Sequence, residues 1–358
     1  MQTAARPDQD DRRIPYGFPT IYGRNLVQEL NAFVHRPFLV VTMDDLWPLF
    51  EAQLDPDRCA PYIVRSVDEA DLIADLAELD AYEAIVGLGG GQALDVAKYF
   101  AWKRRLPLFQ VPTALSVNAV YGQRSGVRVN GHVRYVGWAV PESVFIDYDI
   151  IRAAPPQMNY SGIGDVLCFH TGVLDWKYAS QRGACEAKWP YDPVLAGQSL
   201  EKVERILSHQ DDIRDLTDTG IRVLVDGLKW GTSYHGARWN PRHIEGIDHF
   251  VFYALERLTG KKFLHGQPVC LGIYIGSLLH ESRAEEMLQA MHHIGLDIRP
   301  QAMGISWGDV SEALLGLRRF VNEAGLWHSI AHDVEIGADF VERLRARIEA
   351  QYSAPTEE

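Results

Sequence analysis

The pattern of apolar and polar residues divides the chain into two halves of different character. In the first half, short runs rich in β-branched and aromatic residues recur at 38–43, 61–64, 83–88, 106–112 and 143–147. Segments with apolar residues at helical spacing lie between several of these runs, at 67–80 and 92–105. Strands that alternate with helices in this way predict βαβ units and a mostly parallel sheet. Alternation around Asn130–Gly131 predicts a β-hairpin.

Beyond about residue 150 the apolar residues follow helical spacing throughout. The predicted helices cover residues 166–181, 193–210, 221–236, 248–260 and 310–325. Two prolines within residues 153–157 break regular structure between the halves. We therefore predict an α/β domain over residues 15–154 and an all-helical domain over 155–352. Residues 1–14 and 353–358 are predicted to be flexible ends.

The charge and composition of the chain limit the kinds of partner that it is expected to bind. The formal net charge of −13 argues against nucleic acid and against a membrane surface, since both are anionic. No apolar run reaches the roughly 18–20 residues of a membrane span, and the first residues lack the apolar core of a signal peptide. The four cysteines are far apart and show no CxxC spacing, which predicts reduced cysteines and a cytoplasmic protein.

A glycine-rich turn, GLGGGQALDVAK at residues 87–98, follows one predicted strand and opens a predicted helix. It lacks the Lys-Ser or Lys-Thr end of a Walker A loop, and Gln92 stands where the last glycine of GxGxxG would be. Bare backbone amides at a helix N-terminus favour a phosphate. The alternative is a tight turn followed by a surface ion pair between Asp95 and Lys98.

Asp44 follows the predicted strand at 38–43. An acid at this place often binds the adenosine ribose and repels a 2′-phosphate, which favours NAD(H) over NADP(H). The alternative is an exposed loop acid without a ligand.

One acid and two histidines of the helical half form a candidate metal set. Asp165 ends the motif GIGD, His249 is in GIDHFVFYALE, and His265 is in FLHGQPV. Two imidazoles and a carboxylate leave coordination positions open, as a catalytic divalent metal requires. Each of these histidines taken alone is better explained as an ordinary core or surface residue, so the hypothesis depends on the combination.

The order of GGGQALDVAK, VPTALS, GIGD, GIDH and HG resembles the iron-containing (metal-dependent) alcohol dehydrogenase and dehydroquinate synthase superfamily. The resemblance covers residues 15–330, and residues 141–179 are most similar to its glycerol-1-phosphate dehydrogenase branch. It implies a Rossmann-like dinucleotide-binding domain, a helical domain of the dehydroquinate synthase-like fold, and a cleft that holds NAD(P) and a metal. It also implies a homo-oligomer.

The resemblance assigns roles residue by residue. It implies that Asp165, His249 and His265 bind Zn²⁺, Fe²⁺ or Ni²⁺. It implies that the cofactor is held by one set of residues in the first half: Gly89, Gly90, Gly91, Asp95, Lys98, Thr113 and Ser116.

The sequence departs from the family at four places. Asn118 stands where glycerol-type enzymes have an aspartate that binds polyol hydroxyls, and Tyr253 replaces a second histidine used for proton transfer. HGE has become HGQ at Gln267. The segment before His249 carries Arg238 and Arg242, which either bind a substrate phosphate or carboxylate or are solvated charges.

These features predict a metal-dependent, NAD(P)-linked dehydrogenase that interconverts a secondary alcohol of a small polyol or polyol phosphate and its ketone. The catalytic residues would be Asp165, His249, His265 and Tyr253. Two alternatives stay open: a sugar-phosphate cyclase of the dehydroquinate synthase type, and a nucleotide- and metal-binding protein with reduced activity.

Overall fold

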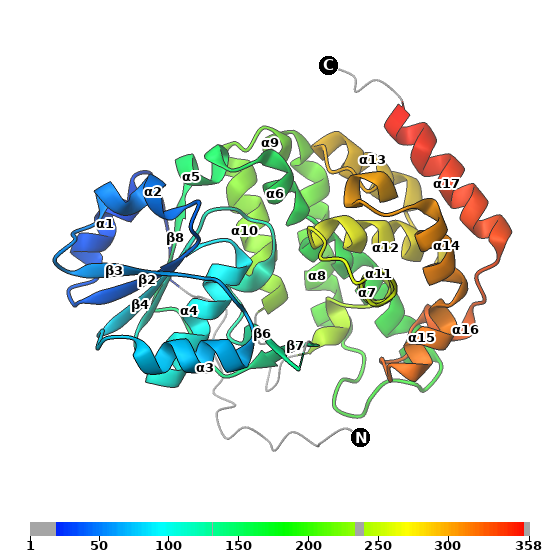
Figure 1. Ribbon diagram of the computed structural model, residues 1–358. Coiled ribbons are helices and arrows are strands. Elements are labelled where there is room, and N and C mark those ends of the chain that lie inside the picture. The colour runs from blue at the N-terminus through cyan, green and yellow to red at the C-terminus, as the bar shows by residue number, and fades with distance from the viewer. Residues whose placement is uncertain (1–18, 131, 233–239, 354–358) are drawn as a thin grey trace. The chain divides into compact units, whose positions relative to one another are not determined.

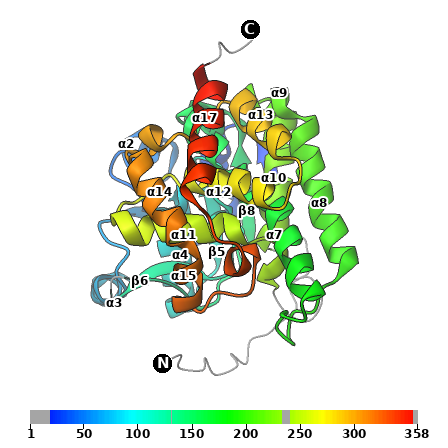
Figure 2. The ribbon, with the colours of Figure 1, turned by 90° about the vertical axis from the view of Figure 1, so that its right-hand side faces the viewer.

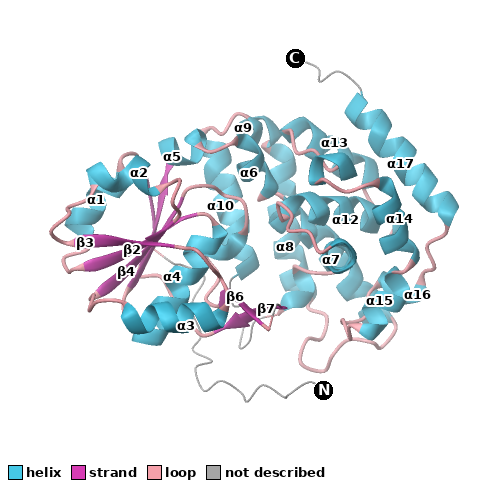
Figure 3. Cartoon of the chain, in the orientation of Figure 1, coloured by secondary structure: helices cyan, strands magenta, loops and turns pink. Residues whose placement is uncertain are grey.

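The computed structural model describes residues 19–130, 132–232 and 240–353, which form two compact units. The N-terminal unit contains the described residues of 1–114 and 118–154, together with Thr232. The C-terminal unit contains residues 115–117, 155–231 and the described residues from 240 onward. The first is built on a parallel sheet and the second on helices, which confirms the predicted fold class (Figure 3).

Six parallel strands form the sheet of the N-terminal unit, in the order β1-β8-β5-β4-β2-β3. Their bounds are β1 (Thr20–Gly23), β2 (Phe38–Thr42), β3 (Cys59–Ile63), β4 (Ala84–Gly89), β5 (Leu108–Pro112) and β8 (Ser143–Asp147). Five of the six were predicted. β1 was not predicted, because four half-buried residues carry no readable periodicity.

Helices cover both faces of this sheet (Figure 1). Leu39 and Val41 of β2 pack on the side of α3 (Glu69–Glu78) and α4 (Gly91–Arg104). Phe38 and Val40 pack on the side of α1 (Leu26–Phe33) and α2 (Trp47–Phe50), which the short η1 (Glu51–Gln53) follows. Because both faces are covered, the strands are continuous apolar runs, as they are in doubly wound sheets.

Outside the main sheet, β6 (Ser125–Val129) and β7 (His132–Val136) form an antiparallel pair. Val129 pairs with His132, and Asn130 has a φ of 53°, so the predicted hairpin is confirmed. The 3-10 turn η2 (Asn118–Val120) precedes it, and α5 (Tyr148–Ala153) ends the unit.

The C-terminal unit consists of helices and short 3-10 turns (Figure 2). Their bounds are α6 (Pro156–Ser161), α7 (Gly164–Gln181), α8 (Pro193–Ser208), α9 (Gln210–Arg214), α10 (Asp218–Thr232), η3 (Pro241–His243), α11 (Ile247–Thr259), α12 (Gly266–Leu279), α13 (Ala284–Ile294), η4 (Pro300–Met303), α14 (Trp307–Leu315), α15 (Leu317–Glu323), α16 (Ile330–Asp333) and α17 (Ala338–Ser353). None of the helices in the described part of the chain combines the length and apolar character needed to cross a membrane.

One helix prediction was wrong and another is only partly testable. The segment 310–325 is not one helix, because α14 ends at Leu315 and α15 begins after Gly316. Glycine weakens a helix interior, and periodicity alone does not register such a break. The predicted helix over 221–236 is present as α10, and its last residues lie outside the described part of the chain.

Asp147 joins the end of β8 to the starts of two helices. Its Oδ1 accepts hydrogen bonds from the backbone N–H groups of Asp149 and Ile150, at 3.0 and 3.3 Å, and so caps α5. Its Oδ2 accepts from the N–H of Leu26, at the start of α1, at 2.7 Å. The residue is only 2% exposed, so these donors have no access to water if the carboxylate is lost.

We expect Asp147→Ala to lower the free energy of unfolding by about 2–4 kcal/mol, since it removes a buried charged acceptor from three donors. Urea denaturation measures this. Asp149→Ala is the matched control, because that side chain is exposed and its ion pairs with Arg24 and Arg152 contribute at most about 1 kcal/mol. Equal losses in the two variants would contradict the capping role.

Candidate active site

The glycine turn lies where the strand order of the sheet reverses. In the sheet, β2 lies between β3 and β4. The chain passes from β2 outward to β3 and then returns to the other side of β2 to form β4. In open α/β sheets, ligands bind outside the carboxyl ends of the strands at such a switch point. Gly89 is the last residue of β4, Gly90 and Gly91 follow it, and Asp44 follows β2. The structure therefore brings two predicted cofactor-binding elements to one edge of the sheet.

The glycines of this turn serve different purposes. A Cβ on Gly89 would lie 2.8 Å from the Cβ of Ala93, so close packing of the turn against α4 requires this glycine. A Cβ on Gly90, by contrast, would meet no atom within 4 Å. Packing within the described protein therefore does not explain the bare backbone at Gly90, which caps the N-terminus of α4. Open space at a helix N-terminus is suited to a phosphate group.

Asp44 is exposed and forms an ion pair with Arg65, with 3.0 Å between Oδ2 and Nη1. The guanidinium offsets the negative charge that was expected to repel a 2′-phosphate. The structure therefore weakens the argument for NAD(H) over NADP(H) at this residue.

Asp95 and Lys98 form an internal ion pair with 2.6 Å between Oδ1 and Nζ. The ammonium group is 1% exposed and also donates to the carbonyls of Ala119 and Arg124, at 2.9 and 2.8 Å. All three donors of Lys98 are thus directed to protein atoms. The pair attaches the loop that begins at Asn118 to α4, so the ion pair is not on the surface, and a cofactor contact by Lys98 is not favoured.

Thr113 and Ser116, predicted to lie near the cofactor, belong to different units. The N–H of Thr113 donates to the carbonyl of Gly89 at 3.0 Å, which places it beside the glycine turn. Ser116 is in the segment 115–117 of the C-terminal unit. The hydroxyl of Ser161 donates to its carbonyl at 3.2 Å and accepts from the N–H of Gly266 at 2.9 Å. Ser116 is thereby linked to the residue that follows His265.

Asp165, His249 and His265, hereafter the triad, come together inside the C-terminal unit. One ligand atom from each lies within 4.8 Å of the others. Asp165 is in the first turn of α7, His249 is in the first turn of α11, and His265 caps α12. His265 Nε2 is 3.0 Å from Asp165 Oδ1, and the carboxylate is only 4% exposed.

Close helix packing explains how residues from three helices meet. A Cβ on Gly272 of α12 would lie 2.3 Å from the carbonyl oxygen of Asp248, so α12 lies directly on the backbone of α11. A Cβ on Gly266 would lie 1.8 Å from the carbonyl oxygen of Ser161, just before α7. Figure 2 shows the ribbons of α7, α11 and α12 next to one another. Side chains at these glycines would force the helices and their ligand atoms apart.

Asp248 orients His249. Its Oδ1 is 2.5 Å from His249 Nδ1 and accepts the N–H of the same residue at 2.8 Å. Its Oδ2 accepts the hydroxyl of Thr171 at 2.6 Å. Burial lowers the pKa of His249, but Asp248, Glu245 and Asp165 outweigh it and raise the pKa to about 9. A carboxylate that accepts the Nδ1–H of a histidine holds the ring in the tautomer whose Nε2 can bind a metal.

A second group of donor atoms shares His249, namely Cys168 Sγ and a carboxylate oxygen of Asp248. Burial, followed by the charges of Asp248 and Asp165, raises the pKa of the Cys168 thiol well above its usual range. The thiol is therefore protonated at neutral pH, and Asp248 is already occupied by Thr171 and His249. The triad is the better metal set.

Tyr253 lies one turn beyond His249, and their ring centroids are 6.1 Å apart. Its hydroxyl donates to Oε1 of Glu245 at 2.6 Å. Burial raises the pKa of Glu245, while His249 and Tyr253 lower it. The sequence analysis missed Glu245, and its position one turn before His249 was the only available signal.

The sequence analysis also missed Asp175, which holds the start of α11. Its Oδ2 accepts the N–H of Ile247 at 2.7 Å, and its Oδ1 accepts the N–H of Ile330 and Nε2 of His280, at 2.8 and 2.9 Å. The residue is 1% exposed. Asp175 therefore positions the helix that carries His249.

The remaining departures from the family pattern differ in their surroundings. Arg242 is fully buried, with Nη1 2.9 Å from the His328 carbonyl and Nε 3.7 Å from Glu186, which favours a structural role over a substrate contact. Gln267 donates its amide to the carbonyl of Asp297 at 2.8 Å, a bond that a glutamate could not make when ionised. Arg238 lies outside the described residues.

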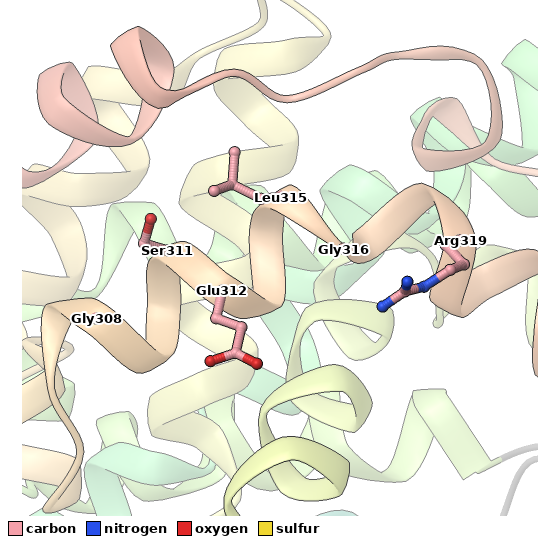
Figure 4. Close-up of a pocket in the computed structure, with 6 residues that line it drawn as sticks. All are labelled: Gly308, Ser311, Glu312, Leu315, Gly316 and Arg319. Atoms are coloured by element: carbon pink, nitrogen blue, oxygen red, sulfur yellow. The ribbon is translucent and has the colours of Figure 1, made fainter.

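A surface hollow on α14 and α15 contains none of the predicted site residues. It is lined by Gly308, Ser311, Glu312, Leu315, Gly316 and Arg319. Figure 4 shows Ser311 and Leu315 on one side of the helix and Glu312 on the other. No group of converging metal ligands or nucleophiles lines this hollow.

The chain combines a doubly wound parallel sheet, a glycine turn at the switch point of that sheet and, in its helical unit, an Asp-His-His set. A family model described as iron-containing alcohol dehydrogenase matches residues 51–155. The chain is also similar to two archaeal proteins named glycerol-1-phosphate dehydrogenase [NAD(P)+]. The protein from Methanosarcina acetivorans is 29% identical over 250 residues, covering 70% of this chain and 69% of the relative.

The protein from Sulfolobus acidocaldarius is 28% identical over 299 residues, covering 81% of this chain and 83% of the relative. Among solved structures, glycerol dehydrogenase from Schizosaccharomyces pombe has the same fold, with a TM-score of 0.70 and 18% identity over 96% of this chain and 92% of that one. These matches confirm the predicted resemblance to the iron-containing alcohol dehydrogenases. They also confirm the class of activity, an NAD(P)-linked and metal-dependent oxidoreductase acting on CH–OH groups.

Replacing Lys98 distinguishes a cofactor contact from a structural ion pair. We expect Lys98→Met to lower the free energy of unfolding by about 2–4 kcal/mol, because half-buried Asp95 and two carbonyls lose the buried ammonium group as their donor. Thermal and urea unfolding measure this loss. Lys103→Met on the same helix, whose ammonium is half-exposed, is the control. An unchanged stability together with a large loss of NAD(H) affinity would show instead that Lys98 binds the cofactor.

Proposed function

We propose that the triad is the metal site of a dehydrogenase that interconverts a secondary alcohol of a small polyol or polyol phosphate and its ketone. The observation that carries the proposal is the convergence of Asp165, His249 and His265 within 4.8 Å. These three residue types, in this order along the chain, are the ones that the resemblance assigns to the metal. The archaeal relatives are named glycerol-1-phosphate dehydrogenases.

The donor set fits a single divalent ion. Bonds of about 2.0–2.2 Å to nitrogen and oxygen let small rotations of these side chains bring all three atoms onto one ion. The buried carboxylate and the histidine held by Asp248 are ligands of the kind that Zn²⁺ and Fe²⁺ accept. Such an ion would supply Lewis acidity at the alcohol or ketone oxygen, and NAD(P) would accept or supply the hydride.

The protein's own groups would bind and orient the reactants. Asp248 and Thr171 hold His249, and Ser161 holds the backbone at His265. Tyr253 is the candidate proton relay, with its hydroxyl held by Glu245. A tyrosine hydroxyl both donates and accepts hydrogen bonds, as a proton relay requires.

The cofactor site would lie at the switch point of the N-terminal unit. The amides of Gly89, Gly90 and Gly91 and the N-terminus of α4 would hold the pyrophosphate, with Thr113 beside them. Asp44 would accept the ribose hydroxyls of NAD(H), while Arg65 beside it keeps NADP(H) as an alternative. Asn118, whose loop is attached through Lys98, is the proposed substrate contact of this unit.

The same proposal includes a cytoplasmic location and a homo-oligomer. The described cysteines are all free, which agrees with a reducing compartment. The net charge of −13 leaves a small molecule as the expected partner, not nucleic acid.

Removing a ligand tests the metal site. We expect His265→Ala to lose bound metal and to lower NAD(P)H-linked turnover at least about 1,000-fold, because the Lewis acid is lost while the fold is kept. Metal content by mass spectrometry and absorbance at 340 nm measure the two effects. His293→Ala is the control, since that ring pairs on the surface with Asp211. Full activity of His265→Ala after chelation would exclude this site, and turnover without net change at 340 nm would favour the cyclase.

Asp248 should tune metal affinity without binding the metal. We expect Asp248→Asn to weaken metal binding about 10- to 100-fold, because the amide cannot hold the Nδ1–H of His249 as the carboxylate does. Competition with a chromogenic chelator measures the affinity. Asp297→Asn removes the same charge from a surface pair with Arg299 and should leave the affinity unchanged. An affinity within about twofold of the original protein would show that Asp248 serves only the packing of α11.

A further inference from the structure

The surface hollow on α14 and α15 lies on a side of these helices that faces away from the core of the C-terminal unit. Figure 2 shows α14 and α15 in front of α11, against which both helices pack. Their buried side chains belong to the core of the unit: Trp307, Val310, Ala313, Leu314, Leu317 and Val321. The hollow itself has a volume of about 550 Å³, which is enough for several side chains of a partner.

An exposed leucine borders the hollow. Leu315 is 52% exposed at the end of α14, and Gly316 beside it carries no side chain. Gly308, two turns earlier, likewise leaves the hollow open. A partner that covers the hollow removes the leucine from water, which favours association. A single exposed leucine is common on protein surfaces, so the charges beside it are needed to identify the partner.

Two opposite charges flank Leu315 along the helices. Glu312 is exposed and precedes it by three residues, while the Arg319 side chain is 81% exposed and follows it by four. Among the described residues, no cationic side chain pairs with the Glu312 carboxylate. Arg319 is 3.8 Å from Glu323, measured from Nε to Oε1, and its guanidinium keeps donors for a second carboxylate. Figure 4 shows Leu315 and Glu312 on either side of the hollow, with Arg319 directed back toward Gly316.

The order of these residues makes the surface complementary to itself. A two-fold axis that crosses the helices between residues 315 and 316 brings α14 and α15 antiparallel to the same helices of a second copy. Glu312 of each copy then lies opposite Arg319 of the other. The two Leu315 side chains meet between these ion pairs. A second copy of the chain therefore matches the surface in both charge and apolar character.

We propose that the face formed by Gly308, Glu312, Leu315, Gly316 and Arg319 is an interface between two identical copies of this chain. It names a surface for the homo-oligomer proposed above, and it does not depend on the dehydrogenase activity. The leucines contribute apolar burial, and the two Glu312–Arg319 pairs fix the register. Two short helices from each copy bury less than the roughly 1,600 Å² of a standard interface, so we expect reversible, concentration-dependent association.

Charge reversal with rescue tests this interface. Glu312→Arg and Arg319→Glu each place like charges opposite one another in both ion pairs, so we expect either variant alone to weaken association at least about 10-fold. In an equimolar mixture, each chain with Glu312→Arg meets opposite charges at both positions of a chain with Arg319→Glu. We expect the mixture to associate as tightly as the original protein. Sedimentation velocity over a concentration series measures all four samples.

Two further variants complete the test. Arg318→Glu reverses an exposed charge that does not line the hollow and should leave association unchanged. Leu315→Asp should weaken association whatever the charges at the neighbouring positions, because it puts two carboxylates where the leucines meet. Circular dichroism checks that each variant is folded.

Three outcomes would overturn the inference. Unchanged association of both charge variants would show that the copies meet through another surface, while the homo-oligomer stands. A mixture that stays as weakly associated as its components would exclude the two-fold pairing of Glu312 with Arg319. An original protein that is monomeric at every concentration would remove both the interface and the homo-oligomer and leave the dehydrogenase proposal untouched, since no substrate enters the measurement.

Discussion

The candidate site depends on backbone contact between the helices that carry its ligands. Asp165 and His249 are set into the first turns of α7 and α11, and His265 caps α12. The ligand atoms lie within 4.8 Å of one another, which requires these helix ends to lie close together. The glycines of α12 allow that approach, and Asp175 fixes where α11 begins. The contacts that pack these helices together are therefore the same contacts that place the metal ligands.

The site also concentrates negative charge. Asp165, Asp248 and Glu245 surround two imidazoles, and burying acids without compensation is costly. Hydrogen bonds from Thr171, Tyr253 and backbone amides offset part of that cost. Protonation of His249, whose pKa is raised to about 9, offsets more of it. A divalent cation can replace that proton and bring further positive charge, so the charges of these side chains favour a metal.

Sequence reasoning predicted the parts of the structure that follow from local pattern. Five of the six parallel strands, the hairpin and helices such as α8, α10 and α11 have a readable period, and the glycine turn and GIGD carry their chemistry in short motifs. It could not predict groups defined only by long-range contacts. Lys98 looked like a surface or cofactor residue because its partners, the carbonyls of Ala119 and Arg124, are distant in sequence. Arg242 looked available for the same reason.

The contacts in the structure explain one departure from the family pattern, the tyrosine at position 253. The resemblance implies a histidine where this chain has Tyr253, whose hydroxyl needs an acceptor when half-buried. Glu245 provides it across one turn of helix. A histidine at position 253 is shorter than tyrosine, so its ring would not carry a donor to the same place. The tyrosine and the glutamate are therefore one structural unit, and a replacement of either leaves the other without its hydrogen-bond partner next to His249.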